Sequence, residues 1–215
     1  MAFAIPDISR ANLAAGLAPL SPEPLDKRAI DALHAHYREL VLWNRRTNLI
    51  GPGTSAEILA RHYGESLAAL PLLPQNARAG LDLGSGAGFP GLVLAAVRPG
   101  LEMTLAEARE RKWAFLASAA RKAALPCRCL NVRVQVPLPP GIPERIDVIT
   151  SRALRLSPET WSALAERLSG DGRVLLWAGE LDPDLPPDLV ACGGVPLAGS
   201  EKRRILALRR SEASL

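Results

Sequence analysis

The segment LDLGSGAGFPGL, residues 81–92, places four glycines within eight positions between two apolar runs. Glycine is concentrated in this way where the backbone must turn tightly or approach another group closely. An apolar strand pattern precedes the glycines and a helical pattern follows them, with Pro90 suited to the first helical turn. A glycine-rich turn between a strand and a helix places backbone N–H groups beside a ligand. The segment therefore predicts a binding loop at the carboxyl end of a strand.

The pattern around this loop sets the fold class. Strand patterns are expected at 79–84, 101–107, 127–134, 145–153, 172–179 and 203–210, and helical patterns at 90–98, 110–125 and 157–168. This alternation predicts an α/β fold with a mostly parallel, doubly wound, Rossmann-like sheet. Residues 1–75 instead predict a helical extension, with one helix after Ser21-Pro22 and a second from about Thr54-Ser55. We therefore expect a boundary near residue 75, between an extension (1–75) and a sheet domain (76–215).

Composition excludes several classes of protein. The 215 residues carry a net charge of +4, which is compatible with a polyanionic partner without requiring one. No apolar run approaches the roughly 18 residues that a membrane span needs, and the N-terminus lacks the pattern of a secretory signal. The three cysteines, an odd number, indicate reduced thiols and a cytoplasmic location. We expect core packing for Cys127 and Cys129, and no metal site.

The ligand of the loop is predicted from two carboxylates. Gly86, Gly88 and Gly91 match the spacing of a dinucleotide fingerprint, which alone is a weak signal. Asp82 stands before the first glycine, where it would repel a pyrophosphate and suit a cationic ligand such as S-adenosylmethionine. Glu107 follows Gly86 by 21 residues (107 − 86), the spacing for a carboxylate that binds ribose hydroxyls. These features favour S-adenosylmethionine over a nicotinamide cofactor, so an NAD(P)-dependent oxidoreductase is the less favoured alternative.

Five segments together resemble one enzyme family. They are LVLWNRRTNLI, RHYGESL, DLGSGAGFPGLVLA, ERKWAFL and ITSRAL, and they stand in the order seen in the RsmG (GidB) family of 16S rRNA guanine-N7 methyltransferases. The resemblance covers about residues 25–180. It implies a class I methyltransferase fold with an N-terminal helical extension, S-adenosylmethionine as cofactor, and 16S rRNA or the 30S particle as partner, and we expect a monomer.

The resemblance also implies site residues. It places cofactor contacts at Gly84, Phe89, Val134 and Gln135, and an arginine near the reacting centre at Arg152. With the residues from the loop argument, the full cofactor set is Asp82, Gly84, Gly86, Gly88, Phe89, Glu107, Val134, Gln135 and Arg152. Candidate RNA-binding residues, chosen from the basic clusters, are Arg45, Arg46, Arg61, Arg133, Lys202 and Arg203.

The chain departs from the family pattern at a few positions. Ala178 stands where the family usually has lysine, Gln135 where it has glutamate, and Glu65 where it has aspartate. A histidine usual near Arg204 is also missing. A related methyltransferase with a different substrate or weak activity is therefore the alternative. The histidines His34, His36 and His62 are expected to be structural, because methylation of guanine N7 requires no general base.

Overall fold

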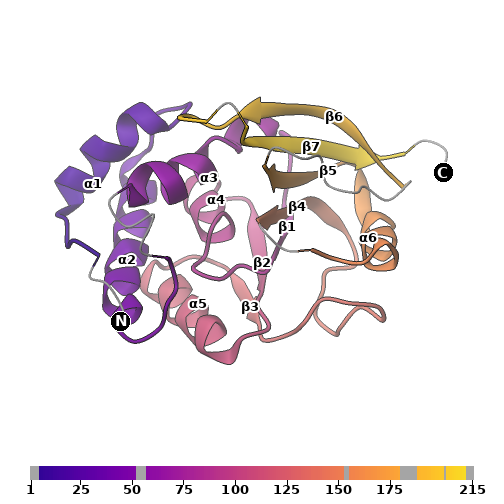
Figure 1. Ribbon diagram of the computed structural model, residues 1–215, viewed down its shortest axis with the longest axis horizontal. Coiled ribbons are helices and arrows are strands. Elements are labelled where there is room, and N and C mark those ends of the chain that lie inside the picture. Colours follow the sequence, from indigo (N-terminus) through magenta and orange to yellow (C-terminus); the bar gives the residue numbers. More distant parts are fainter. Residues whose placement is uncertain (1–4, 52–56, 153–154, 180–187, 201, 212–215) are drawn as a thin grey trace.

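A seven-stranded sheet forms the centre of the protein in the computed structural model, which describes residues 5–51, 57–152, 155–179, 188–200 and 202–211 (Figure 1). The strand order is β3-β2-β1-β4-β5-β7-β6. The strands are β1 (Ala79–Leu83), β2 (Glu102–Ala106), β3 (Arg128–Leu130), β4 (Ile146–Arg152), β5 (Leu168–Ala178), β6 (Leu189–Pro196) and β7 (Arg204–Arg210). The first five in this order are parallel, whereas β7 runs antiparallel to β5 and β6 antiparallel to β7. The predicted mostly parallel sheet is confirmed.

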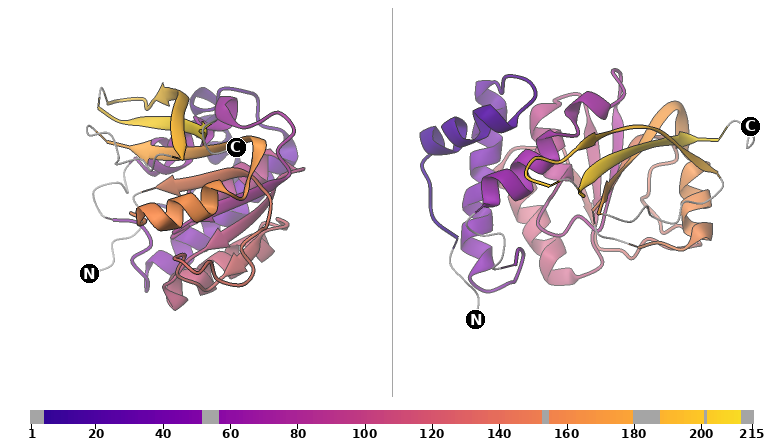
Figure 2. Two further views of the ribbon diagram at one scale, coloured as in Figure 1. Left: turned by 90° about the vertical axis from the view of Figure 1, so that its right-hand side faces the viewer. Right: turned by 45° about the horizontal axis from the view of Figure 1, so that its top comes forward.

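Helices cover both faces of this sheet, as a doubly wound fold requires. Neighbouring residues of one strand alternate between two apolar clusters: Val148 belongs to the cluster with α4 (Gly91–Val97) and α5 (Glu110–Lys122), and Ile149 to the cluster with α6 (Pro158–Ala165). Figures 1 and 2 show α6 at the opposite end of the molecule from the N-terminal helices.

The N-terminal part is helical, as predicted, but its helices begin at other residues. The long helix α2 spans Lys27–Asn44. It begins after Asp26 because the Asp26 side chain accepts a hydrogen bond from the N–H of Ala29 and so caps the helix. Ser21, the expected cap, bonds to the carbonyl of Glu23 in a turn instead. The predicted start of the second helix, Thr54-Ser55, lies outside the described residues. Described helical structure resumes with a π-helical turn, η3 (Leu59–Gly64), followed by α3 (Glu65–Leu67).

Two elements were not predicted. Helix α1 (Arg10–Leu17) begins after Ser9, whose hydroxyl accepts the N–H of Asn12. Strand β6 lies at the sheet edge and leaves most of its residues exposed. In contrast, β3 is shorter than its predicted range, since only Arg128–Leu130 pair with β2. Two short 3-10 turns, η1 (Ala18–Leu20) and η4 (Leu70–Leu72), complete the extension.

The extension and the sheet share one apolar cluster. Leu33 and Tyr37 of α2 pack in the same cluster as Leu92 of α4 and Met103 of β2. Cys127 and Cys129 pack against this cluster, which agrees with their expected structural role. The proposed boundary near residue 75 remains a prediction, because the two parts form a common core.

Candidate functional site

The glycine loop connects β1 to α4 at the carboxyl end of the parallel strands. The N–H groups of Gly84 and Ser85 both donate to the carbonyl of Ala106, which ties the loop to β2. Gly84, Gly86 and Gly88 have φ angles of 69°, 55° and 86°. This left-handed region disfavours side chains, so the glycines fulfil the conformational role that their sequence pattern predicts.

Asp82 supports the loop from behind. It is fully buried, and its carboxylate accepts hydrogen bonds from the Thr150 hydroxyl at 2.7 Å and the Gly91 N–H at 3.3 Å. A Cβ atom on residue 91 would stand 2.7 Å from Asp82 Oδ2, so glycine is required for this approach. Burial raises the pKa of Asp82 to about 6. The side chain anchors the start of α4 and lies outside the lining of the cleft, and the expected contact of Asp82 with a cationic ligand stays a prediction.

Glu107, at the end of β2, faces the loop. Its two carboxylate oxygens accept the N–H groups of Gly86 at 3.0 Å and Arg109 at 2.8 Å. Asn131 donates to the carbonyls of Glu107 and Ala108, which fixes the backbone of this turn. The carboxylate is thus held in place by backbone donors while the residue lines an open cleft.

This cleft has a volume of about 590 Å³ and lies between the loop and the ends of β2 and β4. Five of the nine predicted cofactor residues line it: Gly84, Glu107, Val134, Gln135 and Arg152. The remaining lining residues are mainly apolar or basic, among them Val132, Leu156, Arg109, Lys112, Arg133 and Arg155. The cleft therefore combines one fixed carboxylate with apolar walls and a basic rim.

The other predicted loop residues lie outside this lining. Gly86 and Gly88 shape the backbone, and a Cβ on residue 88 would stand 2.5 Å from Leu92. Phe89 is buried in an aromatic group, where it stacks on His62 with ring centres 5.0 Å apart and meets Tyr63 edge-on. Phe89 thus packs the loop against the extension, and its predicted contact with a cofactor stays a prediction.

The extension also bonds to the loop directly. His36 of α2 is buried, with Nε2 2.9 Å from the carbonyl of Ala87 and Nδ1 2.8 Å from the Tyr63 hydroxyl. Burial lowers the pKa of His36 to about 4 and, together with the charge of Arg152, that of His62 to about 3. Both imidazoles are therefore neutral near pH 7, which agrees with the expected structural role of the histidines. No pattern in the sequence indicated this link to the loop.

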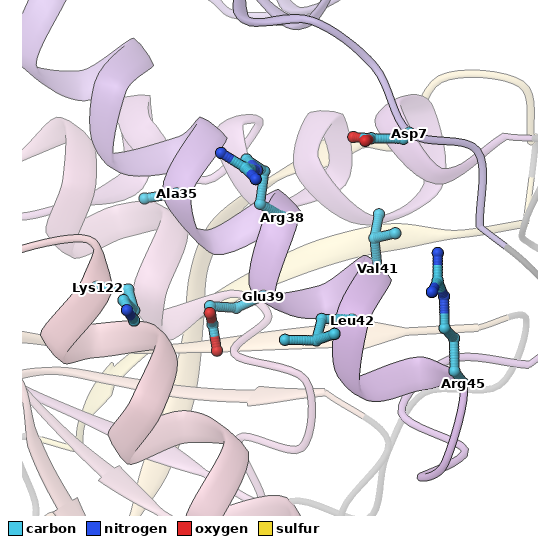
Figure 3. Close-up of a pocket in the computed structure, with 8 residues that line it drawn as sticks. All are labelled: Asp7, Ala35, Arg38, Glu39, Val41, Leu42, Arg45 and Lys122. Carbon is cyan, nitrogen blue, oxygen red and sulfur yellow. The ribbon is translucent and has the colours of Figure 1, made fainter.

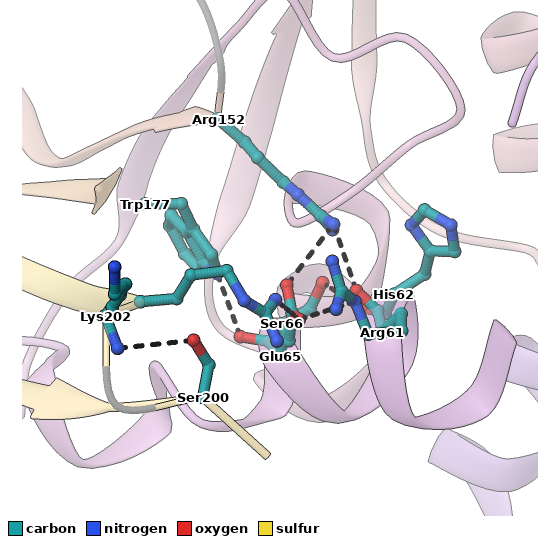
Figure 4. Close-up of polar contacts among 9 residues, drawn as sticks. Arg61, His62, Glu65, Ser66, Arg152, Trp177, Ser200 and Lys202 are labelled. Carbon is teal, nitrogen blue, oxygen red and sulfur yellow. Dashed lines mark hydrogen bonds and ion pairs between the residues drawn. The ribbon is translucent and has the colours of Figure 1, made fainter. Parts of the chain in front are cut away.

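A second group of site residues surrounds Glu65, which is buried at 5% exposure (Figure 4). The Nη2 of Arg152 lies 3.3 Å from Glu65 Oε2, and the Nε of Arg61 lies 3.2 Å from Oε1. Arg203 also donates to Oε1. Arg152 additionally donates to the carbonyl of Arg61 at 3.0 Å. We call Arg61, Arg152 and Arg203, with Glu65 between them, the arginine cluster.

The remaining RNA candidates lie elsewhere. Arg45 and Arg46, after α2, line a separate hollow of about 720 Å³ with Trp43 and Arg111. Arg45 also borders a mixed-charge hollow along α2, where Arg38 and Lys122 stand near Asp7 and Glu39 (Figure 3). Arg133 lines the cleft beside the glycine loop. Lys202 is exposed beside Ser200 (Figure 4).

The profile of a family described as GidB, rRNA small subunit methyltransferase G, matches residues 29–184. A ribosomal RNA small subunit methyltransferase G from Anaeromyxobacter sp. is 39% identical over 170 residues, which cover 77% of this chain and 75% of that protein. A SAM dependent methyltransferase from Aquifex aeolicus superposes with a TM-score of 0.54 at 15% identity, covering 75% of this chain and 94% of the other. TrmN from Thermus thermophilus superposes with a TM-score of 0.53 at 20% identity, covering 71% and 53%. These likenesses confirm the class I methyltransferase fold.

Proposed function

Because the chain belongs to the rRNA small subunit methyltransferase G family, we propose that it uses S-adenosylmethionine to methylate a guanine N7 in small-subunit rRNA. We further propose that it acts in the cytoplasm as a monomer, on 16S rRNA or the 30S particle. The observation that carries the proposal is the cleft in which Gly84, Glu107 and Arg152 meet. Among the described residues, no helix is both long and apolar enough to cross a membrane.

The residues of the cleft fit the proposed cofactor. A nucleoside offers two ribose hydroxyls, and Glu107 provides a carboxylate fixed by the N–H groups of Gly86 and Arg109. The apolar side chains of Val132, Val134 and Leu156 supply a wall suited to a purine ring. Gly84, in its left-handed conformation, brings backbone close to the ligand. When bound, S-adenosylmethionine supplies a methyl group on an electron-poor sulfonium.

The proposed reaction requires the protein to align the two reactants and does not require it to transfer a proton. Guanine N7 attacks through a lone pair and has no proton to lose. The cleft agrees with this requirement, because its described lining contains no histidine, and its one carboxylate is engaged by two backbone donors. Arg152 stands at the cleft wall and can hold the RNA in position through directed hydrogen bonds. Holding two reactants in register can account for several kcal/mol of a barrier.

Methyl transfer from labelled S-adenosylmethionine tests the proposal. Purified 30S particles and naked 16S rRNA serve as substrates, and the modified base is mapped. We expect label on one guanine N7. Label on another RNA, or a very low rate on both substrates, would instead support the alternative that the departures at Ala178 and Gln135 have redirected or weakened the activity.

Calorimetry tests the cofactor independently of the RNA. We expect binding of S-adenosylmethionine and none of NAD, because the chain belongs to a methyltransferase family. Micromolar binding of NAD without binding of S-adenosylmethionine would refute the assignment.

A further inference from the structure

The arginine cluster carries more positive charge than its partner can balance. Three guanidinium groups converge on the single carboxylate of Glu65. The neighbouring His62 adds no charge near neutral pH. The charge of Asp82 raises the pKa of Arg152, but it is the smallest of the effects on that pKa. Burial is the main cause that lowers the pKa of Arg152, and the positive charges of Arg61 and Arg203 lower it further. In the part of the chain that the structure describes, Glu65 is the one carboxylate paired with these three guanidinium groups, so the described cluster holds two more positive than negative charges.

Hydrogen-bonding capacity is also unused. Among the residues that the structure describes, Arg152 Nη1 is a buried nitrogen without a hydrogen-bond acceptor, and Arg61 Nε has only its ion-pair contact with Glu65 Oε1 at 3.2 Å. Buried donors of this kind are rare unless a ligand or another group completes them. The side chains nevertheless keep access to solvent, at 34% exposure for Arg61 and 22% for each of Arg152 and Arg203. An anion could therefore reach them from outside.

Glu65 sets the geometry of these groups. Its carboxylate is 6% exposed and contacts all three arginines, and its carbonyl accepts the indole N–H of Trp177 at 3.0 Å. Trp177 pairs with Arg152 across β5 and β4, so the sheet and the extension hold the cluster from two sides. Three mutually repelling guanidinium groups would separate without such a central anion. Glu65 is thus a positioning residue for the arginines.

The cluster adjoins the cofactor cleft. Arg152 is the last residue of β4, and it both lines the cleft and contacts Glu65. A ligand bound to the free side of the cluster would therefore sit next to the cleft, at the carboxyl edge of the sheet. The planar donors of arginine match the oxygen atoms of a phosphate, which they bind through paired hydrogen bonds.

We propose that Arg61, Arg152 and Arg203, arranged by Glu65, form one binding site for a backbone phosphate of the RNA substrate beside the methylation cleft. This inference rests on the proposed function for the identity of the anion. The phosphate adds negative charge to the cluster and accepts the unused N–H of Arg152, so RNA is held next to the cofactor only when the three arginines act together.

Binding of naked 16S rRNA, measured without cofactor over a series of salt concentrations, tests this site. The variants are Arg61→Gln and Arg203→Gln, and the matched control is Arg121→Gln. Arg121 is exposed in the last turn of α5, which runs back from the cleft toward the amino ends of the strands. Each cluster variant should weaken binding about tenfold and reduce the slope of log affinity against log salt by about 0.7 to 1. The control should keep the slope of the parent protein.

Two further measurements separate the possible roles of the arginines. Thermal unfolding of Arg203→Gln should occur at the same temperature as in the parent protein or at a higher one, because repulsion within the cluster is relieved while Glu65 keeps two partners. A clearly lower unfolding temperature would mean that the cluster is structural and would overturn the proposal. The affinity for S-adenosylmethionine should not change. Loss of cofactor affinity with unchanged rRNA binding would assign the cluster to the cofactor carboxylate and refute the phosphate site.

The outcome is independent of catalysis. Retention of the full salt slope by both cluster variants would refute the phosphate site even if the parent protein methylates 16S rRNA. Conversely, loss of the slope in a protein that transfers no methyl group would support the site and refute the proposed function.

Discussion

Replacing Asp82 by asparagine should change how the stability of the protein depends on pH. The side chain is fully buried, and burial is the main reason that its pKa rises from 3.8 to about 6, against the lowering effect of bonds from Thr150, Ser85 and Gly91. An asparagine of the same shape can accept the Gly91 N–H through its oxygen and donate to the Thr150 hydroxyl through its nitrogen. The variant should therefore fold.

The direction of this pH dependence follows from the number of protons that the folded and the unfolded protein bind. Between pH 3.8 and about 6 the folded protein holds a proton on Asp82 that the unfolded chain has released. The contribution of Asp82 to the free energy of unfolding is therefore present at low pH and is lost as pH rises through about 6. At about 1.4 kcal/mol per pH unit, the whole effect is about 3 kcal/mol, of which about 1.4 kcal/mol falls between about pH 5 and about pH 7.5.

Urea unfolding of the parent protein and of Asp82→Asn at these two pH values measures the effect. The comparison between proteins is needed because the buried His36 and His62, with pKa values lowered to about 4 and about 3, act in the opposite direction. Their contribution is lost as pH falls below about 6.5, and it cancels in the difference. The variant should gain about 1.4 kcal/mol relative to the parent as pH rises. An equal difference at both pH values would refute the raised pKa of Asp82.

Three further substitutions test the loop and Arg152. Gly84→Val should abolish binding of S-adenosylmethionine in calorimetry, because a branched side chain is strained at a φ of 69°; parental affinity in a folded variant would show that the loop is not the site. Gly91→Ala should lower the free energy of unfolding by about 1–3 kcal/mol, since its Cβ would lie 2.5 Å from Leu105 Cδ2. Unchanged stability in urea would contradict that packing. Arg152→Lys should reduce methyl transfer at least about tenfold with the fold intact, because a lysine Nζ could replace Nη2 at Glu65 and the Arg61 carbonyl but would leave no donor in the place of Nη1. Transfer at the parental rate would exclude Arg152 from the reaction.

The sheet and its binding loop were predictable because their signals are local. Glycines in the left-handed region and short apolar strands can be read from neighbouring residues, as at Gly84 and β1. Helix α1 and strand β6 lack such signals: α1 has almost no amphipathic pattern, and β6 contains two adjacent glycines and exposed residues. Their formation depends on contacts with the rest of the chain.

The site was predicted residue by residue but not as an arrangement. Arg61, Arg152 and Arg203 were each expected to bind RNA or act near the reaction, yet they are far apart in sequence and only the fold brings them to Glu65. Asp82 was expected to contact the ligand, and sequence spacing could not show that its buried carboxylate bonds to Thr150 and Gly91, because these partners are set by the fold.

The contacts of His36 and Tyr63 should limit how members of this family diverge, because His36 bonds to the Ala87 carbonyl and Tyr63 bonds to His36 and packs edge-on against Phe89. The contacts join segments that are 51 and 27 residues apart, from His36 to Ala87 and from Tyr63 to His36. A change in loop length in one lineage therefore requires a matching change on α2. A chimera that takes residues 5–75 from one relative and the sheet from another would combine an extension and a glycine loop whose contacting residues do not match. Substitutions at residues 36, 63 and 89, whose side chains make these contacts, should accordingly appear together and not singly as lineages separate.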